Sequence, residues 1–143
     1  MLNKSRIIFG VILVLSLSRL CAYADTEGVI IIANYSIGND EISVRELRDV
    51  FLGNRGQIMG VSIQPVILND PKIHDLFLHA YIGRQSAQFL MHWRNVVFTG
   101  RGRFPRSFEN IEEVVEYVRR TEGAIGYISG PLPENGYKVL VIN

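Results

Sequence analysis

A helix, a three-residue turn and a buried strand follow one another between Asn110 and Ile128, and this unit constrains the fold most. Asn110 supplies a side-chain oxygen at an N-cap position, and Glu113 places a carboxylate three residues later. Valines then recur at helical spacing on one side, at Val114, Val115 and Val118. Residues 121–123 form a turn, and the apolar run 124–128 predicts a short buried strand. A helix leading directly into a buried strand indicates an α/β fold.

Upstream of this unit, the chain alternates in the same way. Residues 29–33 form a continuous β-branched run, which predicts a strand covered on both faces. Ser43 caps a second predicted helix with Glu46 at the capping-box position, and this helix ends at residues 53–54. Residues 61–68 predict another strand, in which a proline at position 65 indicates an edge or an irregular start.

Two further helices are expected in the middle of the chain. Asp70 fits an N-cap and Pro71 the first helical position of a helix that runs to about Ile82. Ser86 is expected to cap the next helix, whose apolar side carries Phe89, Leu90, Trp93 and Val97. Residues 99–105 predict a loop and residues 138–142 a final strand. Together the elements predict an α/β fold with a mixed sheet flanked by helices.

The first residues have the pattern of a secretory signal peptide. Lys4 and Arg6 precede an apolar run over residues 7–17, and Ala22 and Ala24 stand where a signal peptidase requires small residues. We therefore expect residues 1–24 to be a signal peptide cleaved after Ala24, and the protein to be periplasmic or otherwise exported.

The only cysteine lies within this predicted leader. Lipidation of Cys21 is the alternative, but Arg19 and Leu20 occupy positions where small residues are expected. Without its leader the chain keeps twelve Lys and Arg against fourteen Asp and Glu, a net charge of −2. Residues 25–143 are long enough for one domain held by its core, and we expect them to form a single domain without disulfides.

Three motifs resemble a known family. Residues 121–128 read Thr-Glu-Gly-Ala-Ile-Gly-Tyr-Ile and resemble a turn and strand of the phosphate-binding proteins of ABC importers. Residues 42–53 resemble a helix of the same family, and residues 94–103 resemble a stretch of its compact exported members. The resemblance implies one lobe of a type 2 periplasmic binding protein, over about residues 29–128. The other lobe of the full-length proteins has no counterpart in this length.

The resemblance also points to one candidate ligand site after the strand 61–68. Full-length members carry an arginine and a Ser-Gly-Thr segment there, at a helix N-terminus that binds the anion. In this chain the matching candidate residues are Asn69, Asp70 and Lys72. The sequence departs from the family pattern, since Leu68 replaces the cation and Pro71 lacks an N–H. Lys72 is either a point charge for an anion or a solvated surface residue.

The loop Thr99, Gly100, Arg101, Gly102 and Arg103 is the second candidate anion site. Its glycines are expected to let backbone N–H groups face outward, and its two guanidinium groups can bind phosphate or carboxylate bidentately. No acidic residue lies between Asp75 and Glu109, whereas this stretch contains five arginines. The alternative is a solvated basic face that balances the acidic C-terminal half, where Glu109, Glu112, Glu113 and Glu116 lie.

Other classes of function have little support. No Gly-x-Ser-x-Gly elbow surrounds Ser129, and we expect neither an enzyme nor a cofactor. We expect no metal site, because cysteine is absent after residue 21 and the three histidines lack HExxH spacing. The acidic net charge and predicted export argue against nucleic acid. The aromatic residues of this region are expected to be core, namely Trp93 and Phe89, Phe98, Phe104 and Phe108.

Two hypotheses of different class remain open. The first is an exported solute-binding protein for phosphate or a related oxyanion, working with a membrane importer or sensor, with a cleft lined by residues 99–103 and the Asp70-capped helix. The second is a single-lobe interaction domain of the cell envelope that has lost its solute. A homodimer could present the anion loop twice and rebuild a two-sided cleft.

Overall fold

The computed structural model describes residues 28–133 and 135–143. The predicted signal peptide, with its cleavage site after Ala24, lies outside the described residues, as does Cys21. No helix within the described ranges is long and apolar enough to cross a membrane.

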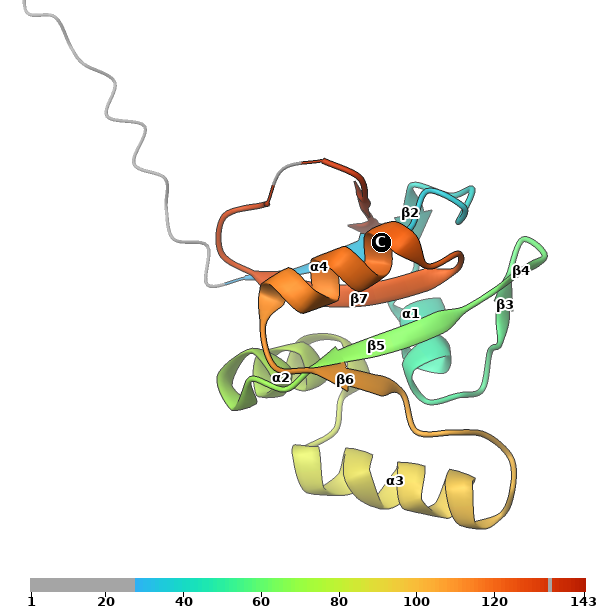
Figure 1. The fold of residues 1–143 in the computed structure, drawn as a ribbon. Helices are drawn as coiled ribbons and strands as arrows, with labels where there is room; N and C mark the ends of the chain where they lie inside the picture. The colour runs from blue at the N-terminus through green and yellow to red at the C-terminus, as the bar shows by residue number, and fades with distance from the viewer. Residues whose placement is uncertain (1–27, 134) are drawn as a thin grey trace, which may run out of the picture.

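A five-stranded mixed sheet forms the centre of the fold, in the order β6-β5-β7-β1-β8 (Figure 1). Its strands are β1 (Val29–Ala33), β5 (Gln64–Leu68), β6 (Arg106–Phe108), β7 (Ala124–Ser129) and β8 (Lys138–Val139). Strand β5 runs parallel to both β6 and β7, whereas β1 is antiparallel to β7 and β8. The predicted mixed sheet is therefore confirmed.

The helices begin where side-chain caps satisfy their first backbone N–H groups. They are α1 (Val44–Phe51), α2 (Pro71–Phe77), α3 (Ser86–Phe98) and α4 (Ile111–Arg120). Ser43 and Glu46 form the predicted capping box of α1, and the side chains of Asp70 and Asn110 cap α2 and α4 as expected. A π-helical turn, η1 (Leu78–Ile82), continues α2.

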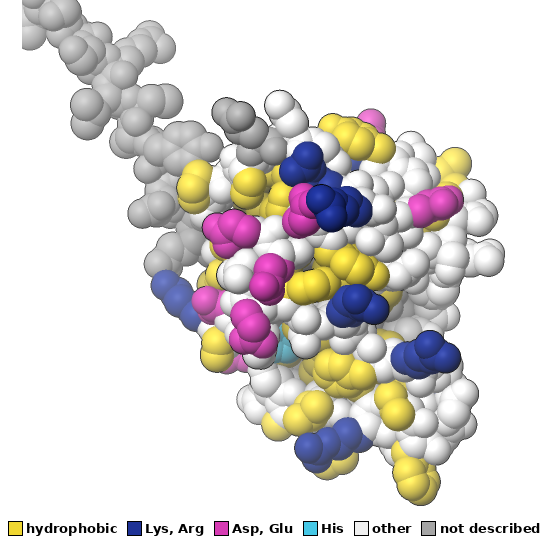
Figure 2. All heavy atoms as spheres, in the orientation of Figure 1, with side chains coloured by type: hydrophobic (Ala, Val, Ile, Leu, Met, Phe, Trp, Pro, Cys, Tyr) yellow, Lys and Arg dark blue, Asp and Glu magenta, His cyan; other side chains and the backbone are white. Residues whose placement is uncertain are grey.

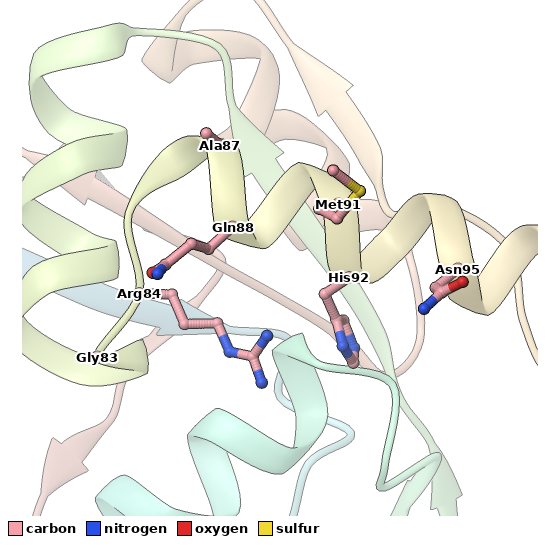
Figure 3. A pocket seen from close by; sticks show the side chains of 7 residues that line it. All are labelled: Gly83, Arg84, Ala87, Gln88, Met91, His92 and Asn95. Atoms are coloured by element: carbon pink, nitrogen blue, oxygen red, sulfur yellow. The ribbon is translucent and has the colours of Figure 1, made fainter.

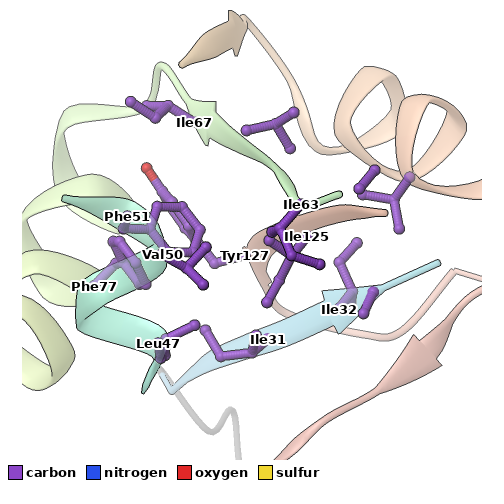
Figure 4. Packing of buried hydrophobic residues seen from close by; sticks show 14 of the residues in the cluster. Ile31, Ile32, Leu47, Val50, Phe51, Ile63, Ile67, Phe77, Ile125 and Tyr127 are labelled. Carbon is purple, nitrogen blue, oxygen red and sulfur yellow. The ribbon is translucent and has the colours of Figure 1, made fainter. Parts of the chain in front are cut away.

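Helices cover both faces of the sheet, and β7 shows how (Figure 1). Gly126 lies against α4, since a Cβ there would be 3.1 Å from Val114. The next residue, Tyr127, points to the opposite face, where its ring packs on Phe51 of α1 and Phe77 of α2 (Figure 4). All of β7 from Ala124 to Ile128 is buried, because both faces are covered.

Several element boundaries differ from the sequence prediction. The predicted strand 61–68 is two strands, because β4 (Val61–Ser62) forms a hairpin with β3 (Gln57–Ile58) and only β5 joins the main sheet. Pro65 is not on an edge strand, and it is tolerated because pairing with β6 begins one residue later, at Val66. The predicted strand 138–142 is also split, since β9 (Val141–Ile142) pairs with β2 (Glu41–Ile42).

Helix α3 differs from its prediction in two ways. Its N-cap is Gln85, because the Ser86 hydroxyl donates to the Asp75 carboxylate and does not cap the helix. Its aromatic residues are not all core. Phe89 and Trp93 are buried, but Phe98 is 90% exposed and Phe104 is 42% exposed. Helical spacing predicted a core position for Phe98, yet the sheet lies on the other side of the helix.

Candidate functional site

The loop predicted to bind an anion follows the C-terminus of α3. Its first three N–H groups close the last turn of that helix, with the Arg101 N–H donating to the Val96 carbonyl at 3.0 Å. The Thr99 hydroxyl also donates to a helix carbonyl and accepts from Arg101 Nε at 3.0 Å. The N–H groups of Thr99, Gly100 and Arg101 thus point into the helix and not outward. The loop presents mainly the Arg101 and Arg103 side chains.

The second predicted group lies at the C-terminal end of β5. The Asn69 amide donates to both carboxylate oxygens of Glu109, at 3.0 and 3.1 Å. The Asp70 carboxylate accepts the Ile73 N–H at 3.1 Å, and Lys72 is exposed in the first turn of α2. The side chains of Asn69 and Asp70 therefore make hydrogen bonds within the fold: Asn69 to the residue after β6, and Asp70 to the first turn of α2.

The structure does not bring the two predicted groups together. Strands β5 and β6 are parallel, and Val66 pairs with Arg106. The loop 99–103 therefore enters β6 at its N-terminal end, whereas Asn69, Asp70 and Lys72 follow the C-terminal end of β5. The two groups lie at opposite ends of one strand pair.

Arg103 instead lines a pocket with two other arginines, which we call the arginine pocket. Its volume is about 370 Å³. The turn after α1 contributes Arg55, the segment before β6 contributes Arg103, and Arg106 is the first residue of β6. The remaining walls come from α1, β5, α3, α4 and the residues just before β5 and β6, with the lining side chains Val50, Ile63, Gln64, Pro65, Trp93, Phe104, Pro105 and Tyr117.

The described lining of the arginine pocket has three arginines and no acidic residue, so the pocket is cationic. Within the described part of the chain, Arg103 makes no hydrogen bond or ion pair. Arg106 stacks over the Tyr117 ring at 5.4 Å, a contact that leaves its guanidinium N–H groups available. Arg55 is the most constrained of the three, since it pairs with Glu46 at 2.9 Å and donates to the Gln57 carbonyl.

The glutamates from Glu109 to Glu116 do not balance these arginines by direct contact. Glu109 accepts from Asn69, and Glu116 pairs with both Arg119 and Arg120 on its own helix. In the described ranges, neither Arg101 nor Arg103 forms an ion pair. Among the described residues, no carboxylate therefore neutralises Arg101 or Arg103 directly.

A second hollow lies between the start of α3 and α1, with a volume of about 690 Å³ (Figure 3). It contains a single arginine, Arg84, beside Gln88, His92 and Asn95. His92 is partly committed, since its Nε2 lies 2.8 Å from the Leu52 carbonyl oxygen. This hollow has one guanidinium group, whereas the arginine pocket has three. It is therefore the weaker candidate for an anion site.

One histidine has a structural role that its sequence position did not indicate. His74 belongs to α2, and its Nδ1 lies 2.5 Å from the hydroxyl of Tyr127 on β7. The contact thus joins α2 to the sheet. Burial lowers the pKa of His74 below its ordinary value of 6.5, and Asp75 partly offsets that effect. The folded protein therefore favours the neutral imidazole.

This lowered pKa predicts that stability rises with pH below about pH 6.5. The unfolded chain binds a proton at His74 in this range more readily than the folded chain does, so acid favours unfolding. The urea midpoint should therefore increase between about pH 5 and pH 7, and His74→Gln should flatten this slope. Urea titrations at half-unit pH steps measure both. An equal slope in the variant would show that His74 is not responsible.

Sequence reasoning missed most of the arginine pocket. Arg106 belongs to the arginine-rich stretch, but only the pairing of β6 with β5 places it beside Gln64 and Pro65 in one pocket wall. Arg55 lies about fifty residues earlier, in a glycine-rich turn without a recognisable motif. Gln64 and Tyr117 join the pocket through a hydrogen bond of 3.0 Å between them. Such long-range neighbours leave no local pattern in the sequence.

Comparisons with known proteins give structural neighbours only. No family model matches the chain, and no curated protein matches it. A Clostridium perfringens protein assigned as a phosphate ABC transporter substrate-binding protein, solved with bound phosphate, aligns with a TM-score of 0.63 at 15% identity. An ABC-type phosphate transport receptor from Vibrio cholerae aligns with a TM-score of 0.51 at 13% identity.

The alignments cover 80% of this chain but only 44% and 46% of the two neighbours. The chain thus spans less than half the length of the proteins it resembles. At these identities the likeness concerns the fold: a mixed sheet flanked by helices, of the kind found in phosphate-binding proteins of ABC transporters.

Proposed function

We propose that this chain is an exported solute-binding domain that binds phosphate or a related small oxyanion in the arginine pocket. The observation that carries the proposal is the acid-free lining with three guanidinium groups, of which Arg103 has no partner among the described residues. An exported binding protein would deliver its ligand to a membrane importer or sensor. The predicted leader and the names of the two structural neighbours support this role.

The chemistry of the arginine pocket suits an oxyanion. Two guanidinium groups, Arg103 and Arg106, can each donate two parallel N–H bonds to one phosphate. The Tyr117 hydroxyl donates to Gln64 Oε1, which leaves the Gln64 amide N–H groups as further donors. A neutral solute would leave the positive charges of Arg103 and Arg106 without compensation, since only Arg55 pairs with a carboxylate. The geometry therefore favours an anion over a sugar or an apolar ligand.

Calorimetric titration of the leaderless chain with phosphate, sulfate and nucleotides tests the proposal. We expect micromolar binding of phosphate, weakened at least tenfold by Arg103→Ala or Arg106→Ala, because each removes a bidentate donor. Arg94→Ala on α3 is the matched control, since it removes a guanidinium outside the pocket. Arg101→Ala distinguishes a contribution of the whole loop from one of the pocket alone.

Flat titrations with every anion, from a chain that circular dichroism shows to be folded, would reject this proposal. They would leave the single-lobe interaction domain as the function. That second candidate is favoured by one observation, because Asn69 and Asp70, at the position of the family's ligand site, make hydrogen bonds within the fold. Sedimentation with and without phosphate tests whether a homodimer completes the site.

A further inference from the structure

The outward side of α3 is unlike that of the other long helices. The exposed residues of α4 include Glu112, Glu113, Arg119 and Arg120, as expected for a helix facing solvent. On α3 the side opposite the buried Phe89 and Trp93 carries Met91, Arg94 and Phe98. Met91 is 64% exposed and Phe98 is 90% exposed. This helix is apolar on both sides, a pattern typical of helices covered on both sides.

These residues form part of a larger surface, which we call the α3 face. It consists of Leu90, Met91, Arg94, Val97, Phe98, Arg101 and Phe104, and a hollow of about 650 Å³ lies within it. Trp93 lines this hollow and is held by a hydrogen bond of 3.1 Å from its indole N–H to the Phe51 carbonyl. In Figure 1 α3 lies apart from the other helices, beyond the β6 edge of the sheet.

The charges on the α3 face are all of one sign and one kind. Between Asp75 and Glu109 the chain has no Asp, Glu or Lys, and its cations are arginines. Figure 2 shows hydrophobic and basic side chains over the lower part of the molecule, where α3 lies, and acidic side chains higher up. Protein interfaces are enriched in aromatic residues, Met and Arg and depleted in Lys, Glu and Asp. The α3 face has this composition.

The same observations argue against two other occupants. A symmetric contact with a second copy would bring Arg94 and Arg101 of both copies together without a carboxylate on that face. An anionic membrane would suit the charge, but a membrane-surface helix carries its cations on a polar face opposite its apolar face, whereas Arg94 lies on the same side as Met91 and Phe98. A membrane surface would also leave the hollow over Trp93 without a side chain to fill it. A protein segment that is acidic and carries a large apolar side chain satisfies both features.

We infer that the α3 face docks an acidic amphipathic helix of a partner protein, with an apolar side chain of that helix in the hollow beside Phe98 and Phe104. Its carboxylates would pair with Arg94 and Arg101, which are exposed on either side of Phe98 in the sequence. The α3 face adjoins the arginine pocket, since Trp93 and Phe104 line both hollows, but Met91, Arg94 and Phe98 do not line the pocket.

The test uses the single tryptophan, Trp93, as a native fluorescent probe of the hollow. The leaderless chain is titrated with a synthetic helical peptide that has leucines at i, i+4 and i+7 and glutamates between them. We expect a saturable fluorescence change in the micromolar range. The same peptide with lysines in place of glutamates should bind at least tenfold more weakly, because it meets only cations.

Matched variants localise the binding. Met91→Ser and Phe98→Ser should each weaken peptide binding at least tenfold, a loss expected at a hot spot. Met59→Ser is the control, since Met59 is 69% exposed at the β3–β4 turn, away from α3. Phe98→Ser should leave the phosphate titration unchanged, so this inference and the proposed function can fail separately.

Four results would overturn the inference. No binding of the acidic peptide up to millimolar concentration would exclude this class of partner, and equal binding of the lysine peptide would exclude the role of the arginines. A fluorescence change with vesicles of phosphatidylglycerol, together with no response to either peptide, would identify a membrane-binding face. Self-association that Phe98→Ser abolishes would identify a second copy as the occupant.

Discussion

Replacing Gly123 by alanine should lower the free energy of unfolding by roughly 2–5 kcal/mol, from backbone strain and overpacking together. Gly123 has a φ of +72°, where an L-residue is strained. A Cβ there would lie 1.9 Å from the Ser62 carbonyl oxygen, so the backbone before β5 would have to move. The effect is large because neither the conformation nor the contact tolerates a side chain.

The Gly123 turn joins three parts of the fold. Its N–H donates to the Ser36 hydroxyl at 2.8 Å, and its carbonyl accepts the Gln64 N–H at 2.9 Å. Gln64 also lines the arginine pocket. We therefore expect Gly123→Ala to weaken phosphate binding as well, through displacement of the start of β5.

Gly130→Ala is the control that separates the two causes. Gly130 has a φ of +84°, but nothing lies within 4 Å of the position its Cβ would take. This variant should cost only the strain of the left-handed conformation, about 1–2 kcal/mol. Urea unfolding followed by circular dichroism measures both variants. Equal losses would show that the contact with Ser62 is relieved at no cost.

The parts of the fold that sequence predicted depend on neighbours within four residues. The caps at Ser43, Asp70 and Asn110 are of this kind, because a cap needs only a side-chain oxygen and an N–H two or three positions later. The motif 121–128 likewise marks a turn and a buried strand that are contiguous in the chain. The structure has these helices and this strand at the positions that the local sequence pattern predicts.

The parts that sequence missed depend on what lies beside them in space. Strand β6 has three residues and two of them are exposed, so no alternation marks it, and it is a strand only because β5 pairs with it. Phe98 has the spacing of a core residue, but only the position of the sheet decides which side of α3 is buried. Arg55 and Arg103 line one pocket because the turn after α1 and the segment before β6, far apart in the sequence, pack close together in the fold.

The His74–Tyr127 contact is a further case, and it carries the second large prediction. Tyr127 is fully buried at the centre of β7, and its ring stacks on Phe77 with centroids 3.9 Å apart and planes at 6°. Its hydroxyl reaches His74 at 2.5 Å and the Leu68 carbonyl at 3.4 Å. Burial raises the pKa of this phenol, so the hydroxyl stays protonated across the physiological range.

Tyr127→Ala should therefore cost about 3–5 kcal/mol of unfolding free energy, as expected for removal of a fully buried aromatic ring. Tyr127→Phe keeps the ring and removes only the hydroxyl, which leaves His74 Nδ1 without that contact, and should cost about 1–3 kcal/mol. The difference between the two variants measures the contribution of ring packing between α1, α2 and β7.

Tyr117→Phe is the matched hydroxyl deletion. The Tyr117 hydroxyl donates to Gln64 at an exposed site, where water can replace it, so its loss should change stability by less than about 0.5 kcal/mol. If Tyr127→Phe were as mild, the short contact with His74 would add nothing to stability. A cost well above that of Tyr117→Phe would instead show that the buried hydroxyl links α2 to the sheet. The pH slope assigned to His74 should then also change in Tyr127→Phe, because the same imidazole loses its buried partner.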